Sequence, residues 1–158
     1  MICVDDDILL DRDAINWHLK AHKMMPGSVV FGQCIFRPAS RESRSQAYLA
    51  ELSPVVDPAA GLVPQPVVAS GQISFERAQF APDGPYRSDL RTPAAEEYEL
   101  SFRLARRGIP IYLEPRAVGT HLVTGGVTEK TIQEFKYGIA VGELFYKVPE
   151  LKEFAPYA

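Results

Sequence analysis

A run of three aspartates, Asp5–Asp7, follows the apolar residues Ile2–Val4 near the start of the chain. Like charges repel one another, and the sequence offers no lysine or arginine before Arg12 to neutralise them. Carboxylates at alternate positions of an extended turn, such as Asp5 and Asp7, can point the same way and suit Mg²⁺ or Mn²⁺. A solvated turn explains the run equally well, so both interpretations stay open at this point.

A second acidic cluster consists of Glu96, Glu97 and Glu99 in the sequence EEYEL. These residues occupy the first turns of an expected helix, where the positive end of the helix dipole favours carboxylates. That reason is sufficient for two of the three. Leu100 and Leu104 define the buried stripe of this helix. Glu96 and Glu97 lie one turn earlier, near the edge of that stripe, so one of them can face a cleft and accept a proton from a substrate hydroxyl.

The histidines and cysteines are weaker candidates for chemistry. His18 and His22 lie one helical turn apart, a spacing that can bind zinc, but the glutamate of HExxH is absent and we interpret both as structural. His121 lies in AVGTHL, just after an expected strand and loop. Cys3 and Cys34 lie in apolar runs at a spacing that fits no zinc motif, so we expect buried free thiols in a reducing, cytoplasmic compartment.

Length and composition limit the classes of protein to consider. The 158 residues are enough for one domain with its own core, and the net charge of −3 gives no electrostatic footprint for nucleic acid. No apolar stretch approaches the roughly 20 residues that cross a bilayer, and no signal peptide is visible. Because the first strand enters its loop almost at once, we expect Met1 to be an internal methionine and the chain to be a fragment.

Strands and helices alternate along the chain, which predicts an α/β domain. A proline-rich stretch, 53–66, reads as a loop. The expected strands cover 2–4, 27–36, 67–75 and 109–115, and the expected helices start after Asp11 or Asp13 and cover 42–52, 94–107 and 129–147.

Details of the first and third helices follow from local signals. Ile15, Leu19 and His22 recur at the spacing of one helix face. Thr92 is a good N-cap for the third helix, since Pro93 follows it at the first helical position.

The last helix carries Ile132, Phe135 and Ile139 on one face. Gly138 and Gly142 lie one turn apart on it, and close packing against another helix would explain them.

The order of these signals resembles the family 2 glycosyltransferases with the GT-A fold, in which helices flank a mixed sheet. The likeness covers most of the chain and is poorest over 38–66. In this family the DxD strand lies near the middle of the domain. The resemblance therefore implies that 1–125 is the C-terminal half of a GT-A catalytic domain without its nucleotide-binding half, and that 126–158 is a C-terminal helical extension. The segments that carry it are VDDDI, ASGQISFERAQF, EEYELSFRLARRGIPIYLEP, AVGTHL and FKYGIAVGELFYKVPEL.

The resemblance implies a role for each acidic residue of the first run. Asp5 and Asp7 match the DxD motif that holds a divalent metal, Mg²⁺ or Mn²⁺, on the diphosphate of the donor. His121 matches a histidine that completes the metal shell in some members. Asp6 would contact the ribose or sugar of the donor.

The resemblance also implies the base and the acceptor side of the site. Glu97 takes the position of the general base, where the family usually has aspartate, and Glu96 precedes it. The stretch DGPYRSD stands where the family usually has Gly-Gly-Phe-Asp. The segment SGQIS matches a stretch that lines the site between donor and acceptor, which makes Ser70, Gly71, Gln72 and Ser74 candidate binding residues.

The expected activity is the inverting transfer of a sugar from a nucleotide-diphosphate donor to the hydroxyl of a saccharide or lipid-linked acceptor. The cytoplasm, or the inner surface of its membrane, would be the location. A Mg²⁺-dependent phosphotransferase or hydrolase and a non-catalytic binding or structural α/β module remain alternatives. One cleft shared by Asp7, Glu97 and His121 would exclude the module, and their dispersal would exclude the enzyme.

Overall fold

A computed structural model describes residues 1–52, 61–62, 71–80, 82, 84–91 and 96–154. A six-stranded sheet with the order β1-β5-β3-β6-β2 lies at the centre, and β4 also pairs with β6. β3 and β6 run parallel, whereas the other pairs are antiparallel, so the sheet is mixed. The strands are β1 (Ile2–Val4), β2 (Ile8–Leu10), β3 (Val29–Pro38), β4 (Gly61–Leu62), β5 (Gln72–Ser74) and β6 (Ile111–Val123).

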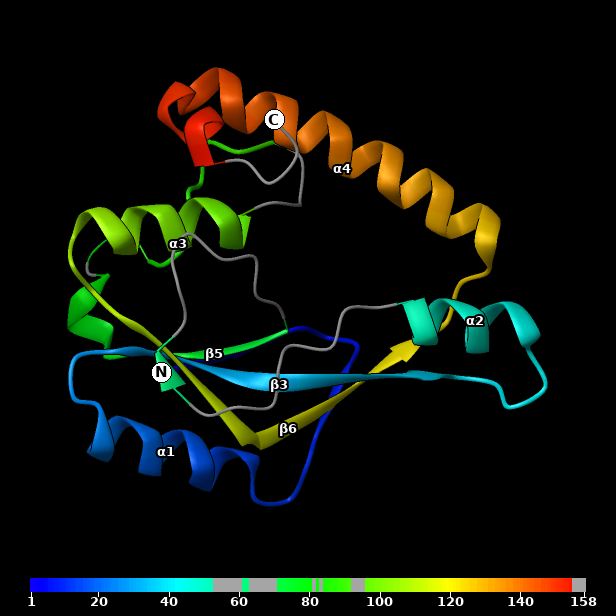
Figure 1. The fold of residues 1–158 in the computed structure, drawn as a ribbon, viewed down its shortest axis with the longest axis horizontal. Coiled ribbons are helices and arrows are strands. Elements are labelled where there is room, and N and C mark those ends of the chain that lie inside the picture. The colour runs from blue at the N-terminus through cyan, green and yellow to red at the C-terminus, as the bar shows by residue number, and fades with distance from the viewer. Residues whose placement is uncertain (53–60, 63–70, 81, 83, 92–95, 155–158) are drawn as a thin grey trace.

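Helices flank this sheet, and the α/β class expected from the sequence is confirmed. In Figure 1, α1 covers one face of the sheet and α3 the other, while α4 passes from the end near α2 to the end near α3. The helices are α1 (Ala14–Met24), α2 (Arg44–Leu52), α3 (Glu96–Arg106) and α4 (Val127–Lys147), with short 3₁₀ helices η1 (Arg77–Gln79) and η2 (Pro149–Phe154).

The apolar core lies between the sheet and α3. Leu100 and Leu104 are fully buried, as the helical spacing predicted, and α3 ends before Gly108, which has a φ of 65°. Ile111 and Leu113 alternate inward from β6, as expected for a strand. The core cluster comprises Val29, Phe31, Ile73, Phe75, Phe80, Leu100, Leu104, Ile111 and Leu113.

The face between the sheet and α1 is polar, and the residues of α1 that recur at helical spacing in the sequence do not form its buried face. Ile15 and Leu19 are 52% and 56% exposed. The buried face instead carries Ala14, His18 and Ala21, since two alanines let the helix approach the sheet closely and the histidine finds hydrogen-bond partners there.

A register shift in the ladder between β3 and β6 accompanies this polar face. The shift falls between Gly32 and Gln33, and two backbone carbonyls beside it face the Gln72 side chain. The Nε2 group of Gln72 donates to both of them, at 2.9 Å to the oxygen of Gln33 and 2.8 Å to that of Ala117. A Cβ at Gly32 would lie 2.3 Å from the Gln72 side chain, so a glycine there makes room for the amide.

The last helix forms as expected, but the packing expected for its glycines is wrong. Among the described residues, a Cβ at Gly138 or at Gly142 would meet nothing within 4 Å, so no close contact with another described helix requires these glycines. The helix packs through Leu144 onto α3 and η2. Its other apolar face, with Ile132, Phe135 and Ile139, is exposed.

The remaining expectations have mixed outcomes. Asp13 takes the N-cap position of α1 but its side chain makes no capping hydrogen bond. Within the stretch read as a loop, residues 61–62 form β4. Cys3 and Cys34 lie within β1 and β3 and form no disulfide; Cys34 is buried as expected, whereas Cys3 is only half-buried. The expected cap of α3, at residues 92–93, lies outside the described residues. Among those described, no helix is long and apolar enough to cross a membrane.

Two glycine-to-alanine substitutions should have opposite effects on stability. At Gly71, where φ is 87°, a Cβ would lie 2.2 Å from Ile8 Cδ1 and 2.6 Å from Cys34 Sγ. We expect Gly71→Ala to lower the free energy of unfolding by about 1–3 kcal/mol. The matched change Gly138→Ala, in open space on a helix, should raise it by about 0.5–1 kcal/mol. Urea unfolding of both variants measures these effects, and equal destabilisation by both would contradict the packing described here.

Candidate acidic site

The three aspartates form the turn between β1 and β2. The amide of Ile8 donates to the carbonyl of Asp5 at 3.2 Å, which closes a turn with Asp6 and Asp7 at its centre. The amide of Asp5 donates to the carbonyl of Gly71 at 3.0 Å and so joins the turn to the start of β5. Asp6 is exposed at the tip of this turn.

Asp7 contacts His121 directly. The Nε2 group of His121 lies 2.8 Å from Oδ2 of Asp7, and the imidazole ring packs against Phe36 with its centroid 4.8 Å away. His121 lies within β6, opposite Ile8, and not after a loop as the sequence had indicated, because β6 continues beyond Pro115. The long strand therefore carries the histidine to the acidic turn.

This pair fits a divalent cation that is shared with another ligand. Carboxylate oxygens suit Mg²⁺ and Mn²⁺, and imidazole is a common ligand of first-row transition metals. No group of three or more His, Cys, Asp or Glu side chains at ligand spacing occurs among the described residues. Asp7 and His121, with Asp5 nearby, would thus supply only part of a coordination shell.

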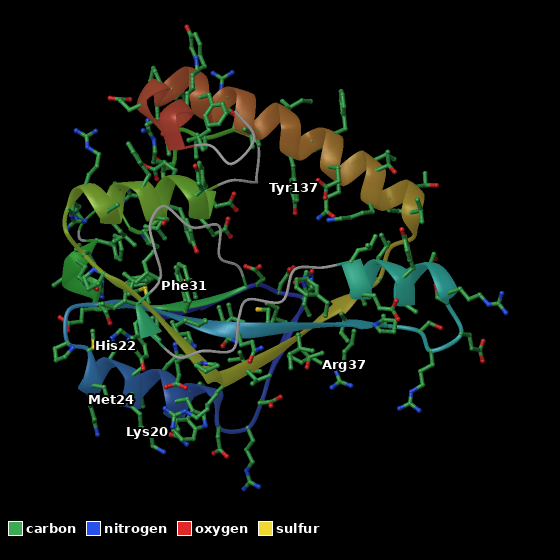
Figure 2. The ribbon with its side chains drawn as sticks, viewed as in Figure 1. Lys20, His22, Met24, Phe31, Arg37 and Tyr137 are labelled. Atoms are coloured by element: carbon green, nitrogen blue, oxygen red, sulfur yellow. The ribbon has the colours of Figure 1, made fainter. Side chains whose placement is uncertain are left out.

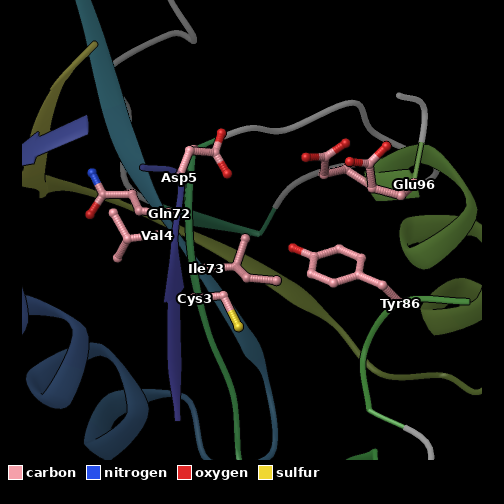
Figure 3. Close-up of a pocket in the computed structure, with 9 residues that line it drawn as sticks. Cys3, Val4, Asp5, Gln72, Ile73, Tyr86 and Glu96 are labelled. Atoms are coloured by element: carbon pink, nitrogen blue, oxygen red, sulfur yellow. The ribbon is translucent and has the colours of Figure 1, made fainter. Parts of the chain in front are cut away.

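Asp5 faces a cavity of about 160 Å³ that it shares with the start of α3. Figure 3 shows Asp5 and Glu96 on opposite sides of this acidic cavity, with the Tyr86 ring below them. Glu97 also lines it. Residues from the acidic turn and from EEYEL, far apart in the sequence, therefore meet around one cavity.

Two carboxyl groups of the acidic cavity, those of Glu97 and Asp5, hold protons more tightly than usual. Burial, then the charge of Glu96 and to a lesser extent that of Asp5, raise the pKa of Glu97 to about 7 from an ordinary value of 4.5. Burial and then Asp7 also raise the pKa of Asp5, against an opposing effect of His121. The helix dipole by itself would favour the ionised form of Glu97, but burial together with repulsion from the neighbouring carboxylates outweighs it.

The described lining of the acidic cavity contains no basic side chain. No lysine, arginine or histidine lines the acidic cavity, and the parts of the chain outside the described residues contain none in their sequence. The Oε2 atom of Glu96 is buried and has no hydrogen-bond partner among the described residues. The acidic cavity therefore offers carboxylate oxygens to a ligand that brings protons or positive charge.

Glu99 plays a different part from its two neighbours. It is 4% exposed, and its two oxygens accept hydrogen bonds from Arg103 Nε at 3.1 Å and Nη2 at 2.9 Å. The same Nη2 group donates to the carbonyl of Pro85, so the pair holds the preceding segment against α3.

The structure divides the proposed metal ligands from the proposed base. Asp7 and His121 line a second cavity of about 470 Å³, which also includes Lys130 and Lys136, whereas Glu97 lines the acidic cavity. Asp5 connects the two, because its carboxyl responds to the charges of both Asp7 and Glu96. The arrangement lies between the two outcomes considered from the sequence, neither one shared cleft nor dispersal.

Two candidate binding residues of SGQIS, Gly71 and Gln72, line the acidic cavity beside Ile73. The side-chain polar groups of Gln72 and Ser74 instead make hydrogen bonds in the layer beneath α1. Ser70 lies outside the described residues.

Two tyrosines near the acidic cavity were not expected from the sequence. Tyr86 lines it, and burial followed by the charge of Glu97 raises the pKa of its phenol. Tyr137 points from α4 toward the sheet in Figure 2, and Glu97 is among the charges that raise its pKa after burial and Glu134. Neither residue belongs to a spacing pattern that could have revealed it, since the fold alone brings them close.

Comparison with protein-family models, with curated proteins and with solved structures finds no match to this chain.

Replacing Glu97 should stabilise the protein at alkaline pH. Since its folded pKa of about 7 lies above the ordinary 4.5, this carboxyl favours the folded state at low pH, and that contribution is lost as the pH rises from 4.5 to 7. We expect Glu97→Gln to raise the free energy of unfolding by about 2–3 kcal/mol near pH 8 and by little near pH 4.5.

Glu99→Gln is the matched control, because it breaks a buried ion pair and should lower stability by about 1–3 kcal/mol at both pH values. Urea unfolding at the two pH values tests the pair of variants. If the Glu97→Gln protein is no more stable than its parent near pH 8, the pKa of Glu97 is not raised in the folded protein.

Proposed function

We propose that this chain is part of an inverting glycosyltransferase of the family 2 type, with a GT-A-like fold. It would move a sugar from a nucleotide-diphosphate donor to the hydroxyl of a saccharide or lipid-linked acceptor. The observation that supports this most is the meeting of Asp5, Glu96 and Glu97 around one cavity. A carboxyl with a pKa of about 7 in that cavity is suited to proton transfer at neutral pH.

Glu97 is the general base in this proposal. Its carboxylate accepts the proton of the acceptor hydroxyl while that oxygen attacks the anomeric carbon of the donor sugar. The bond between this carbon and the diphosphate oxygen breaks, and its electron pair leaves with the diphosphate. Attack from the face opposite the leaving group inverts the configuration at the anomeric carbon. Glu96, whose buried Oε2 has no partner among the described residues, accepts a further hydrogen bond from the acceptor.

Asp5, Asp7 and His121 form the donor side in this proposal. These residues would hold a divalent cation, Mg²⁺ or Mn²⁺, which supplies positive charge to neutralise the departing diphosphate. The contact with His121 orients the Asp7 carboxylate before the donor arrives. Asp6, at the tip of the turn, is free to contact the ribose or sugar.

The alternatives account for less of the arrangement. A binding or structural module gives no reason for a carboxyl with its pKa raised to about 7 beside another with an unpartnered buried oxygen. A phosphotransferase or hydrolase would use the aspartates directly and would leave the glutamates of α3 without a role.

The metal ligands can be tested by Mn²⁺ titration. In the complete protein with nucleoside diphosphate present, Asp7→Asn should weaken Mn²⁺ binding by about tenfold or more, since a hard cation loses a charged oxygen ligand. His121→Ala should have a smaller effect, because water can replace the imidazole. Asp11→Asn, at an exposed aspartate just beyond β2, is the control and should bind as the parent does. Parental Mn²⁺ affinity in both Asp7→Asn and His121→Ala would refute the assignment.

The base can be tested by release of nucleoside diphosphate from a panel of nucleotide-sugars with candidate acceptors. In the complete protein, Glu97→Gln should lower turnover by roughly 10²–10⁴ while donor binding stays nearly unchanged, because the amide keeps the shape and cannot accept the proton. Glu99→Gln is the control, and its turnover per folded molecule should fall far less.

Two results would count against the assignment of the base. Loss of turnover in Glu96→Gln with none in Glu97→Gln would show that Glu96 is the base in place of Glu97. If neither variant loses turnover, α3 does not carry the base and the mechanism fails.

A further inference from the structure

A buried hydrogen-bonded chain lies on the opposite side of β5 from the acidic cavity, beneath α1. His18, Gln72 and Ser74 are 2%, 1% and 4% exposed. Nδ1 of His18 lies 2.8 Å from the Ser74 hydroxyl, and its Nε2 lies 3.1 Å from Oε1 of Gln72. Nε2 of His22 lies 2.8 Å from the same hydroxyl. We call these four residues the histidine chain.

The partners determine where each proton of the histidine chain sits. Nε2 of Gln72 donates to two backbone carbonyls, so its Oε1 must accept, and Nε2 of His18 must carry a hydrogen. In the neutral ring Nδ1 of His18 then accepts from the Ser74 hydroxyl. The oxygen of Ser74 in turn accepts from Nε2 of His22. In the neutral ring of His22, Nδ1 then carries no hydrogen, and that atom is buried without a partner among the described residues.

An added proton does not fit the histidine chain. On Nδ1 of His22 it would be a buried donor with no acceptor among the described residues. On Nδ1 of His18 it would displace the hydrogen that Ser74 donates, and two N–H groups would converge on one hydroxyl oxygen. Each case leaves a buried donor unsatisfied, so the chain is satisfied best when both histidines are neutral.

The surrounding charges do not reverse this preference. Burial is the largest influence on both histidines and lowers the pKa of each below the ordinary 6.5. For His18, the hydrogen bond to Gln72 and the charge of Glu114 on β6 raise the pKa, whereas the charge of His22 lowers it. For His22, the amino group of Met1 lowers the pKa, whereas the charge of Glu76 after β5 raises it.

We infer that the histidine chain is an acid-sensitive latch between α1 and the sheet. Protonation of its histidines leaves a buried donor without an acceptor, and this cost favours release of α1, with loss of its hydrogen bonds to Ser74 and Gln72 on β5. Because a released histidine takes up a proton near pH 6.5, the docked form loses its advantage as the pH falls below about 6.5. Since β5 also borders the acidic cavity, release would loosen that cavity, and this inference does not depend on the proposed activity.

Trp17 makes the latch observable. It is the only tryptophan of the chain, and the guanidinium of Arg116 on β6 lies 3.9 Å from its ring centroid. Release of α1 separates the two, so tryptophan emission should shift to the red between about pH 6.5 and about pH 5, while far-UV circular dichroism keeps its helical signal. The ratio of released to docked protein should rise by up to about tenfold per pH unit for each histidine.

The decisive variant is His22→Gln, which keeps an N–H donor for Ser74 and cannot titrate in this range. In this variant the transition reported by Trp17 emission should involve the uptake of one proton in place of two, and it should occur at lower pH. His121→Gln is the matched control, since that histidine contacts Asp7 and Phe36, and it should keep the parental transition.

Amide hydrogen exchange of the unaltered protein, corrected for intrinsic rates, gives a test that needs no variant, and protection within α1 should fall over the same pH range. Constant Trp17 emission and constant α1 protection down to about pH 5 would overturn the inference. A His22→Gln protein with the parental transition would overturn it as well.

Discussion

The side-chain amide of Gln72 closes the one irregular step between β3 and β6, and the rest of the described sheet is arranged around it. The amide donates to the carbonyls of Gln33 and Ala117 beside that step, and a buried carbonyl left unpaired costs about 1–3 kcal/mol. Because Gln72 must reach both, β5 lies beside β3 at a defined register. The backbone of Gly71 then receives the amide of Asp5, so the same constraint positions the acidic turn.

The two faces of the sheet consequently serve different purposes. The face toward α3 is packed with apolar side chains, and carboxyl groups at its margin are partly withdrawn from water, which is the main reason that Glu97 holds a proton near neutral pH. The face toward α1 is hydrogen-bonded, with His18 and Ser74 as its centre. A single short strand, β5, separates the carboxyl groups from the histidines.

Sequence reasoning predicted those parts of the molecule whose signals are local. The α3 helix follows from the spacing of Leu100 and Leu104, and β1 from the apolar run before the aspartates. The buried face of α1 could not be predicted, because the partners of His18 lie 54 and 56 residues away and only the fold brings them together. The same holds for the candidate site: the acids were identifiable by type and position, but the pKa of Glu97 depends on burial that no local pattern reveals.

The contact between Asp7 and His121 joins residues 114 positions apart, and this has a consequence for the order of folding. β1 and β2 are synthesised before the strands that they pair with, β5 and the end of β6, so they remain unpaired until those strands have been made. Contacts of such long range form slowly. During that wait the like charges of Asp5–Asp7 discourage pairing with the strands of other chains. The acidic turn thus protects the nascent protein from aggregation before it has any site to serve.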